Sequence, residues 1–338
     1  MNKTILYIMN IIEKANKVYL ENFKPVTWFE RALFFSWYCK IADCKYCYMS
    51  TQPNKNKNAV RSVASILAET IICKKLGWKI GFISSGHNAY STEKLLLLMK
   101  SINKITGKKV WFNIGVLKED ELKMFSPYIE GVVGAIETVN PKLHDELCPS
   151  KPVEPFTKMF EVCKKLGIKN AMTIITGLGE TIKDFELLKE FIEKYDIEKI
   201  HIYGLNPQKG TMFENKESPT AEYQSEWIAK TRIAFPKIDI QAGIWADKVE
   251  NVSALLEAGA NSISKFPAIR KFNSKEAMRI EEESEKAGRV FEGSLVKLPK
   301  EEEFSKELEK IPNNLKREVD IKLIKYIKLM KKRKNKDK

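Results

Sequence analysis

Residues 169–205, KNAMTIITGLGETIKDFELLKEFIEKYDIEKIHIYGL, contain two short apolar runs separated by a segment of helical periodicity. The apolar runs cover 169–176 and 199–205, and the segment between them, 181–195, repeats its apolar residues every three to four positions. Buried parallel strands read as continuous apolar runs of this length, and a helix usually connects them. The stretch therefore predicts a strand–helix–strand unit.

The same alternation continues on both sides of this unit. Further strands are predicted at 32–38, 78–84, 108–115, 131–137, 238–244 and 262–266, with helical segments between them. Eight strand–helix pairs in about 250 residues are typical of a (β/α)8 TIM-type barrel, an α/β fold. An open, doubly wound sheet is the alternative that the pattern leaves open.

Two helical segments flank the predicted barrel of residues 29–290. Residues 1–28 begin with apolar positions at helical spacing, Ile5, Ile8, Ile12 and Ala15, and residues 291–338 form a charged helical extension that ends in the basic run KKRKNKDK. The chain has no run of about 18 apolar residues, and no cleavage site follows its first helix. We expect a cytoplasmic protein without a membrane partner.

The formal net charge of the 338-residue chain is +14. Basic and acidic residues alternate along most of the sequence, which indicates a solvated surface rather than a nucleic-acid footprint. No separate RNA-binding domain is visible, so a nucleic-acid partner is not expected. Modification of tRNA or another macromolecule remains an alternative function.

Three of the six cysteines lie within nine residues, as C-x4-C-x2-C at Cys39, Cys44 and Cys47, directly after the first predicted strand. Structural zinc needs four protein ligands, whereas three thiolates on a cubane iron–sulfur cluster leave one iron open. A strand end at this face of a barrel is where barrel enzymes place their chemistry. A zinc-stabilised binding or scaffold protein remains the alternative.

Several segments resemble the radical S-adenosylmethionine (SAM) superfamily, and in particular its biotin synthase-like group. They are DCKYC (43–47), AIETVNPKLHDEL (135–147), IITGLGET (174–181), GTMFE (210–214) and EAGANSI (257–263). The resemblance runs in order through about residues 30–290. The usual cysteine spacing of the family is C-x3-C-x2-C, and this chain has one additional residue before Cys44.

The resemblance implies two cofactors and a set of contacts to them. Cys39, Cys44 and Cys47 would ligate a 4Fe–4S cluster, and SAM would chelate the fourth iron. The remaining matches would contact SAM. Tyr46, between the last two cysteines, would lie near the adenine. Those at strand ends would be Ser85 and Gly86 at the amino group, Asn113 at a less defined position, Glu137 at the ribose, and Ile175 and Gly177 along the adenine. Alternation along 131–137 places Val133, Ala135 and Glu137 on one strand face.

The implied activity is reductive cleavage of SAM to a 5′-deoxyadenosyl radical that acts on a small-molecule substrate. A one-electron donor such as ferredoxin or flavodoxin would be required. Taken alone, each SAM-binding segment also has a structural interpretation: a glycine turn, a capping carboxylate or a loop. His87 and His201, near strand ends, read as solvent-facing or core histidines.

The sequence predicts one cluster and no auxiliary cluster. Cysteines are absent from the third and fifth predicted strands and from the chain after Cys163. Ile244 and Trp245 occupy the segment where biotin synthases carry an arginine for their second cluster, so biotin synthesis is not expected. The cysteine spacing and the lysine-rich composition resemble the methanogen proteins that build the iron-guanylylpyridinol cofactor of the mono-iron (Hmd) hydrogenase.

Overall fold

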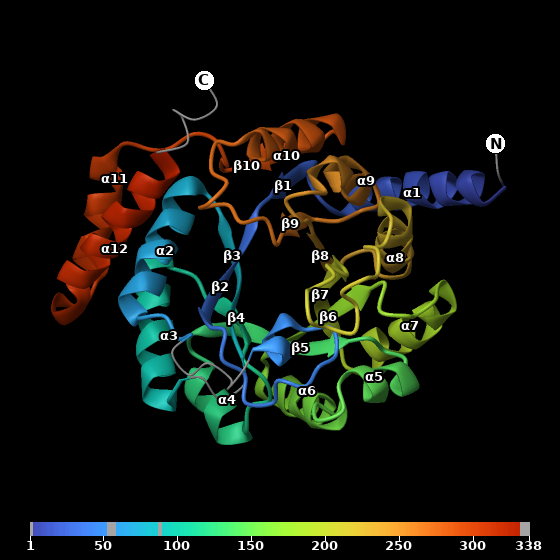
Figure 1. Cartoon of the computed structure of the whole chain (residues 1–338), viewed down its shortest axis with the longest axis horizontal. Helices are drawn as coiled ribbons and strands as arrows, with labels where there is room; N and C mark the ends of the chain where they lie inside the picture. The colour runs from blue at the N-terminus through green and yellow to red at the C-terminus, as the bar shows by residue number, and fades with distance from the viewer. Residues whose placement is uncertain (1–2, 53–58, 87–89, 332–338) are drawn as a thin grey trace.

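The computed structural model describes residues 3–52, 59–86 and 90–331, and its centre is a parallel eight-stranded sheet in the order β2-β3-β4-β5-β6-β7-β8-β9. A parallel bridge between Phe29 and Ile263 joins the two ends of this sheet. The strands therefore ring a common axis with helices outside them (Figure 1). The predicted TIM-type barrel is confirmed, and the open-sheet alternative is wrong.

The barrel strands agree closely with the apolar runs of the sequence. They are β2 (Glu30–Ser36), β3 (Lys79–Ser85), β4 (Val110–Asn113), β5 (Ile129–Glu137), β6 (Lys169–Thr176), β7 (Ile197–Gly204), β8 (Asp239–Gly243) and β9 (Ser262–Ser264). The prediction for β2 ran two residues too far. After Ser36 the chain pairs instead with residues 59–61, since Trp37 N donates to Ala59 O and Arg61 N donates to Phe35 O.

Helices follow the strands and cover the outside of the barrel. They are α2 (Val63–Leu76), α3 (Thr92–Thr106), α4 (Glu119–Phe125), α6 (Glu154–Leu166), α7 (Phe185–Lys194), α8 (Ala221–Ala234), α9 (Val252–Glu257) and α10 (Lys275–Lys286). The short α5 (Pro141–Leu147), between β5 and α6, was not predicted. Gly77 and Gly167 end α2 and α6 with φ near +70°, a backbone conformation that glycine adopts without strain.

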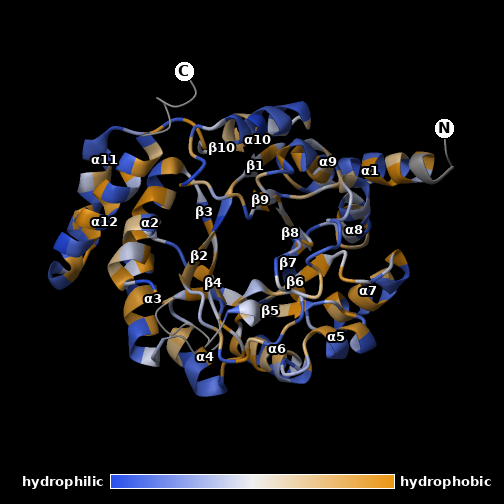
Figure 2. Cartoon of the chain, viewed as in Figure 1, coloured by the Kyte–Doolittle hydropathy of each residue, from blue (hydrophilic) through white to orange (hydrophobic). Residues whose placement is uncertain are grey.

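The main hydrophobic core lies between the strands and the surrounding helices. Figure 2 shows hydrophobic residues on the helix faces turned toward the strands and hydrophilic residues on the outer faces. A separate, small cluster fills the barrel interior, where Phe82, Val133 and Ala171 pack against one another. This arrangement leaves the space above the interior cluster for a site.

The chain ends add elements outside the barrel. Helix α1 (Lys3–Asn22) packs on α8 and α9, and α11 (Glu301–Ser305) and α12 (Asn313–Lys331) lie beside α2 (Figure 1). A two-stranded parallel sheet, β1 (Val26–Trp28) with β10 (Val290–Glu292), joins the segment before the barrel to the segment after it. The sequence did not predict this pairing. Most of the basic tail, and His87, lie outside the described residues.

None of the helices that the structure describes combines the length and apolar character that crossing a bilayer requires.

Candidate active site

A cavity of about 1040 Å³ opens at the carboxyl ends of the barrel strands. Nine of the ten predicted site residues line it: Cys39, Cys44, Tyr46, Cys47, Ser85, Gly86, Asn113, Glu137 and Ile175. Gly177 follows Ile175 and does not line the cavity. Ligand pockets in proteins commonly measure about 300–1,000 Å³, so the space exceeds the needs of one small ligand.

The cysteine loop is held in place by backbone hydrogen bonds to two distant segments. Lys45 N donates to Leu147 O (2.9 Å) at the end of α5, and Met212 N donates to Lys45 O (3.1 Å). Between the first two cysteines, Ala42 adopts φ +44°, an uncommon conformation for a residue with a side chain. These bonds hold the 135–147 and 210–214 segments against the cysteine loop.

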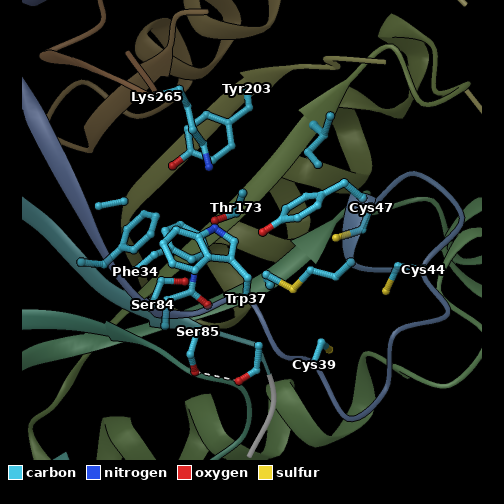
Figure 3. Close-up of a pocket in the computed structure, with 18 of the residues that line it drawn as sticks. Phe34, Trp37, Cys39, Cys44, Cys47, Ser84, Ser85, Thr173, Tyr203 and Lys265 are labelled. Atoms are coloured by element: carbon cyan, nitrogen blue, oxygen red, sulfur yellow. Dashed lines mark hydrogen bonds between the residues drawn. The ribbon is translucent and has the colours of Figure 1, made fainter. Parts of the chain in front are cut away.

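Gly86 is required for the close approach of β3 to the cysteine loop. A Cβ atom at this position would lie 1.9 Å from Tyr38 O and 2.6 Å from the Cα of Cys39. The hydroxyl of Ser85 donates to Gly86 O at 2.7 Å, as Figure 3 shows. The glycine therefore lets the end of β3 touch the first cysteine.

The thiols of the loop differ in their surroundings. A hydrogen bond with Cys148 lowers the pKa of Cys44, against the opposing effect of burial, whereas burial raises the pKa of Cys47 to about 11. Cys148 is itself buried, directly after α5. The sequence gives this cysteine no role, because 104 positions separate it from Cys44 and no motif marks it.

Glu137 ends β5 and is buried at the cavity wall, 2.9 Å from the ammonium of Lys151. Its φ is +67°, and the pairing of β5 with β6 shifts register just before it. As predicted, Val133 points into the barrel interior, and Ala135 and Glu137 line the cavity above it. Lys151 was missed. Burial opposes its charge, yet Glu137 raises the pKa of this ammonium.

An apolar wall adjoins the cysteines. Tyr46 and Ile175 pack against the buried side chains of Leu178, Leu205 and Phe213. Gly177 turns the chain after β6 with φ +95°, and the carboxylate of Glu180 accepts hydrogen bonds from Gly177 N (2.6 Å) and Leu178 N (2.8 Å). The Glu180 carboxylate thus fixes the conformation of the Gly-Leu-Gly-Glu turn. This turn positions Ile175 at the cavity wall.

Another group of side chains lines the cavity opposite the cysteines. Figure 3 shows Tyr203 and Lys265 on one side and Cys39, Cys44 and Cys47 on the other. The rings of Phe34 and Trp37, whose centres lie 6.3 Å apart, stack on each other and also line the cavity. The cavity therefore has a thiol end and an end with aromatic and cationic character.

Within the described residues, no group of three or more His, Cys, Asp and Glu side chains is close enough to hold a single metal ion. His201 is buried inside the barrel against Phe82, as a core histidine, and burial lowers its pKa to about 3. The three loop cysteines face one cavity from one loop, and they are the soft donors that iron–sulfur clusters use. This donor set fits a cubane cluster.

Comparison with known proteins gives the family. The profile of the Radical SAM superfamily matches residues 38–214. An uncharacterized protein of the methanogen Methanocaldococcus jannaschii is 41% identical over 85% of this chain and 80% of its own length. The biotin synthase of Thermotoga neapolitana is 24% identical over 68% of this chain and 80% of its own. Methylornithine synthase shares the fold, with a TM-score of 0.69, 21% identity and 78% of each chain covered.

The chain belongs to the radical SAM superfamily, and it is an enzyme of that class. The cofactors of this class are a 4Fe–4S cluster and S-adenosylmethionine, as the sequence resemblance implied.

Proposed function

We propose that the protein binds one 4Fe–4S cluster on Cys39, Cys44 and Cys47, cleaves SAM reductively and acts on a small-molecule precursor. The observation that carries the proposal is the convergence of nine predicted site residues, from five separate segments of the chain, on one cavity. When bound, the cluster supplies the electron that splits SAM into methionine and the 5′-deoxyadenosyl radical. A ferredoxin or flavodoxin would provide that electron.

The chain's own residues would position SAM and exclude water. Ser85, Gly86 and Asn113 line the cavity beside the cysteine loop and would face the amino-acid part of SAM. Tyr46 and Ile175 present an apolar wall to the adenine. Glu137 would accept hydrogen bonds from the ribose hydroxyls, and its ion pair with Lys151 orients the carboxylate at the cavity wall.

The cysteine assignment is tested by cluster reconstitution without oxygen. We expect wild type to bind about four irons per chain and to absorb near 400 nm, and we expect Cys44→Ala to lose both the cluster and SAM cleavage. Because Cys148 adjoins Cys44, the variant should also be made with Cys148→Ala, so that no substitute thiol masks the effect.

Cys163→Ala is the control, because this thiol is buried in α6, away from the cavity. Full SAM cleavage by the Cys44→Ala, Cys148→Ala double variant would contradict the assignment. About eight irons per chain, with an EPR signal that survives loss of all three loop cysteines, would reveal an auxiliary cluster.

For the pathway, we propose biosynthesis of the iron-guanylylpyridinol cofactor of Hmd hydrogenase. The support is the C-x4-C-x2-C spacing together with the methanogen relative. A methanogen strain without the gene should accumulate Hmd protein that lacks its cofactor. Normal cofactor content in that strain would refute the pathway and leave the radical SAM assignment untouched.

A further inference from the structure

One half-buried cation in the cavity, the ammonium of Lys265, has no carboxylate partner among the described residues. Three basic side chains that line the cavity pair with carboxylates: Arg31 and Arg61 with Glu69, and Lys151 with Glu137. A fourth, Arg270, is exposed to solvent. Lys265 also lines the cavity, and no carboxylate of the described residues lies within ion-pairing distance of its ammonium.

The surroundings of Lys265 make this charge costly. Its Nζ lies 4.1 Å from the centre of the Tyr203 ring, a cation–π contact that partly stabilises the charge. Burial lowers the pKa of Lys265 to about 8, against the attraction of Glu137 and Cys47. Lys265 is half-buried, and a charge that is partly removed from water and has no counter-charge is costly unless a ligand completes its surroundings.

The backbone at Lys265 points to the same conclusion. The residue follows β9 with φ +69°, a left-handed conformation that is uncommon for a residue with a side chain and that clusters at functional sites. Glu137, at the end of β5, shares this feature. Both residues lie at the carboxyl ends of barrel strands and line the cavity, on the face where barrel enzymes bind their substrates.

We propose that Lys265 binds the carboxylate of a small, largely apolar substrate and thereby fixes the end of that substrate remote from the cluster. The inference rests on the proposed function, which assigns the thiol end of the cavity to the cluster and SAM. A single ammonium matches a single negative charge, whereas phosphate sites usually gather several donors. Phe34, Trp37 and Tyr203 supply the apolar and aromatic contacts for the rest of the molecule.

The test uses matched pairs of small probes: benzoate with benzamide, phenylacetate with phenylacetamide, and nicotinate with nicotinamide. Their dissociation constants are measured by ligand-observed NMR on the cluster-loaded protein with SAM present. In wild type we expect at least one carboxylate to bind about 10- to 100-fold more tightly than its amide, because the ammonium pairs with the anion and not with the amide.

Two substitutions locate the preference. Lys265→Met keeps the length of the side chain and should abolish the preference for the carboxylate, and Lys265→Arg should retain most of it. Arg270→Met removes another positive charge from the cavity lining, in an exposed position, and should leave the preference intact. An unchanged preference in Lys265→Met, or no binding of any carboxylate to wild type, would overturn the proposal.

The same samples separate this inference from the proposed function. If wild type forms no cluster or does not cleave SAM, the proposed function fails first. If both occur and Lys265→Met loses affinity for SAM itself, Lys265 belongs to the SAM carboxylate and the substrate assignment is wrong.

Discussion

At the amino-terminal end of the barrel, the buried carboxylate of Glu30 accepts hydrogen bonds from four side chains, which are Trp28, Lys199, Gln241 and Ser262. At the carboxyl-terminal end, Lys265 has an aromatic ring beside it and, among the described residues, no paired carboxylate. Glu30 is buried in the first barrel strand, and Lys265 is half-buried directly after the last one. Only Glu30 is balanced by an opposite charge and by hydrogen bonds from the protein itself.

The backbone repeats this contrast. Of the five described residues that have a side chain and a positive φ, Ala42, Glu137 and Lys265 surround the cavity or sit in the cysteine loop, whereas Asp196, directly before β7, and Asn273 lie elsewhere. An unpaired charge and a strained backbone each lower the stability of the folded state. We infer that the amino-terminal end of the barrel serves folding and the carboxyl-terminal end serves binding.

The largest expected effect is a difference in stability between substitutions of two lysines, Lys199 and Lys265. Lys199→Met would leave Glu30 buried without its ammonium partner and Asp239 without its ion pair, and should lower the free energy of unfolding by about 3–5 kcal/mol. Lys265→Met removes an unpaired charge and should lower it little or raise it. Urea unfolding of both variants against wild type measures the difference. Equal losses would show that the two ends of the barrel do not differ in this way.

The second-largest expected effect is a loss of stability in acid, caused by protonation of Glu30 at the amino-terminal end of the barrel. Burial by itself would raise the pKa of Glu30, but Lys199 and Trp28 outweigh it and hold this pKa at about 2. Because the pKa in the folded state lies below the ordinary value, the stabilisation is present above about pH 5 and is lost as the pH falls toward 2. Its size is on the order of 3 kcal/mol.

The measurement is the free energy of unfolding from pH 6 to pH 3 in wild type and in Glu30→Gln. The difference in the free energy of unfolding between the two proteins should shrink steadily as the pH falls. Acid removes the charge of Glu30 from wild type, and the substitution removes the same charge at every pH. A difference that stays constant with pH would mean that Glu30 stabilises the barrel by packing alone.

The sequence predicted most of the barrel because its strands are short apolar runs and its helices end at glycines such as Gly77 and Gly167. It predicted the cavity residues that belong to local motifs, including the three loop cysteines. It could not place Cys148, Lys151 or Lys265, since their roles depend on contacts between segments far apart in the chain. It also missed the pairing of β1 with β10, because three-residue strands leave almost no periodic signal.

The smallest effect concerns Glu137, where the strained end of the barrel would meet SAM. Glu137→Gln keeps the shape of the side chain and removes its charge. A hydrogen bond to a charged group contributes about 1.5–3 kcal/mol, so the affinity for SAM should fall about 10- to 100-fold while the cluster still forms. The measurement is a SAM titration followed by EPR of the reduced cluster.

Glu130→Gln is the matched control for this prediction, because Glu130 lies in the same strand but pairs with Lys169 outside the cavity. It should bind SAM as wild type does. If Glu137→Gln also binds SAM normally, Glu137 serves only to neutralise Lys151, and its positive φ reflects that ion pair rather than a ligand. The carboxyl-terminal end would then resemble the amino-terminal end at β5, and the contrast between the two ends would rest on Lys265 alone.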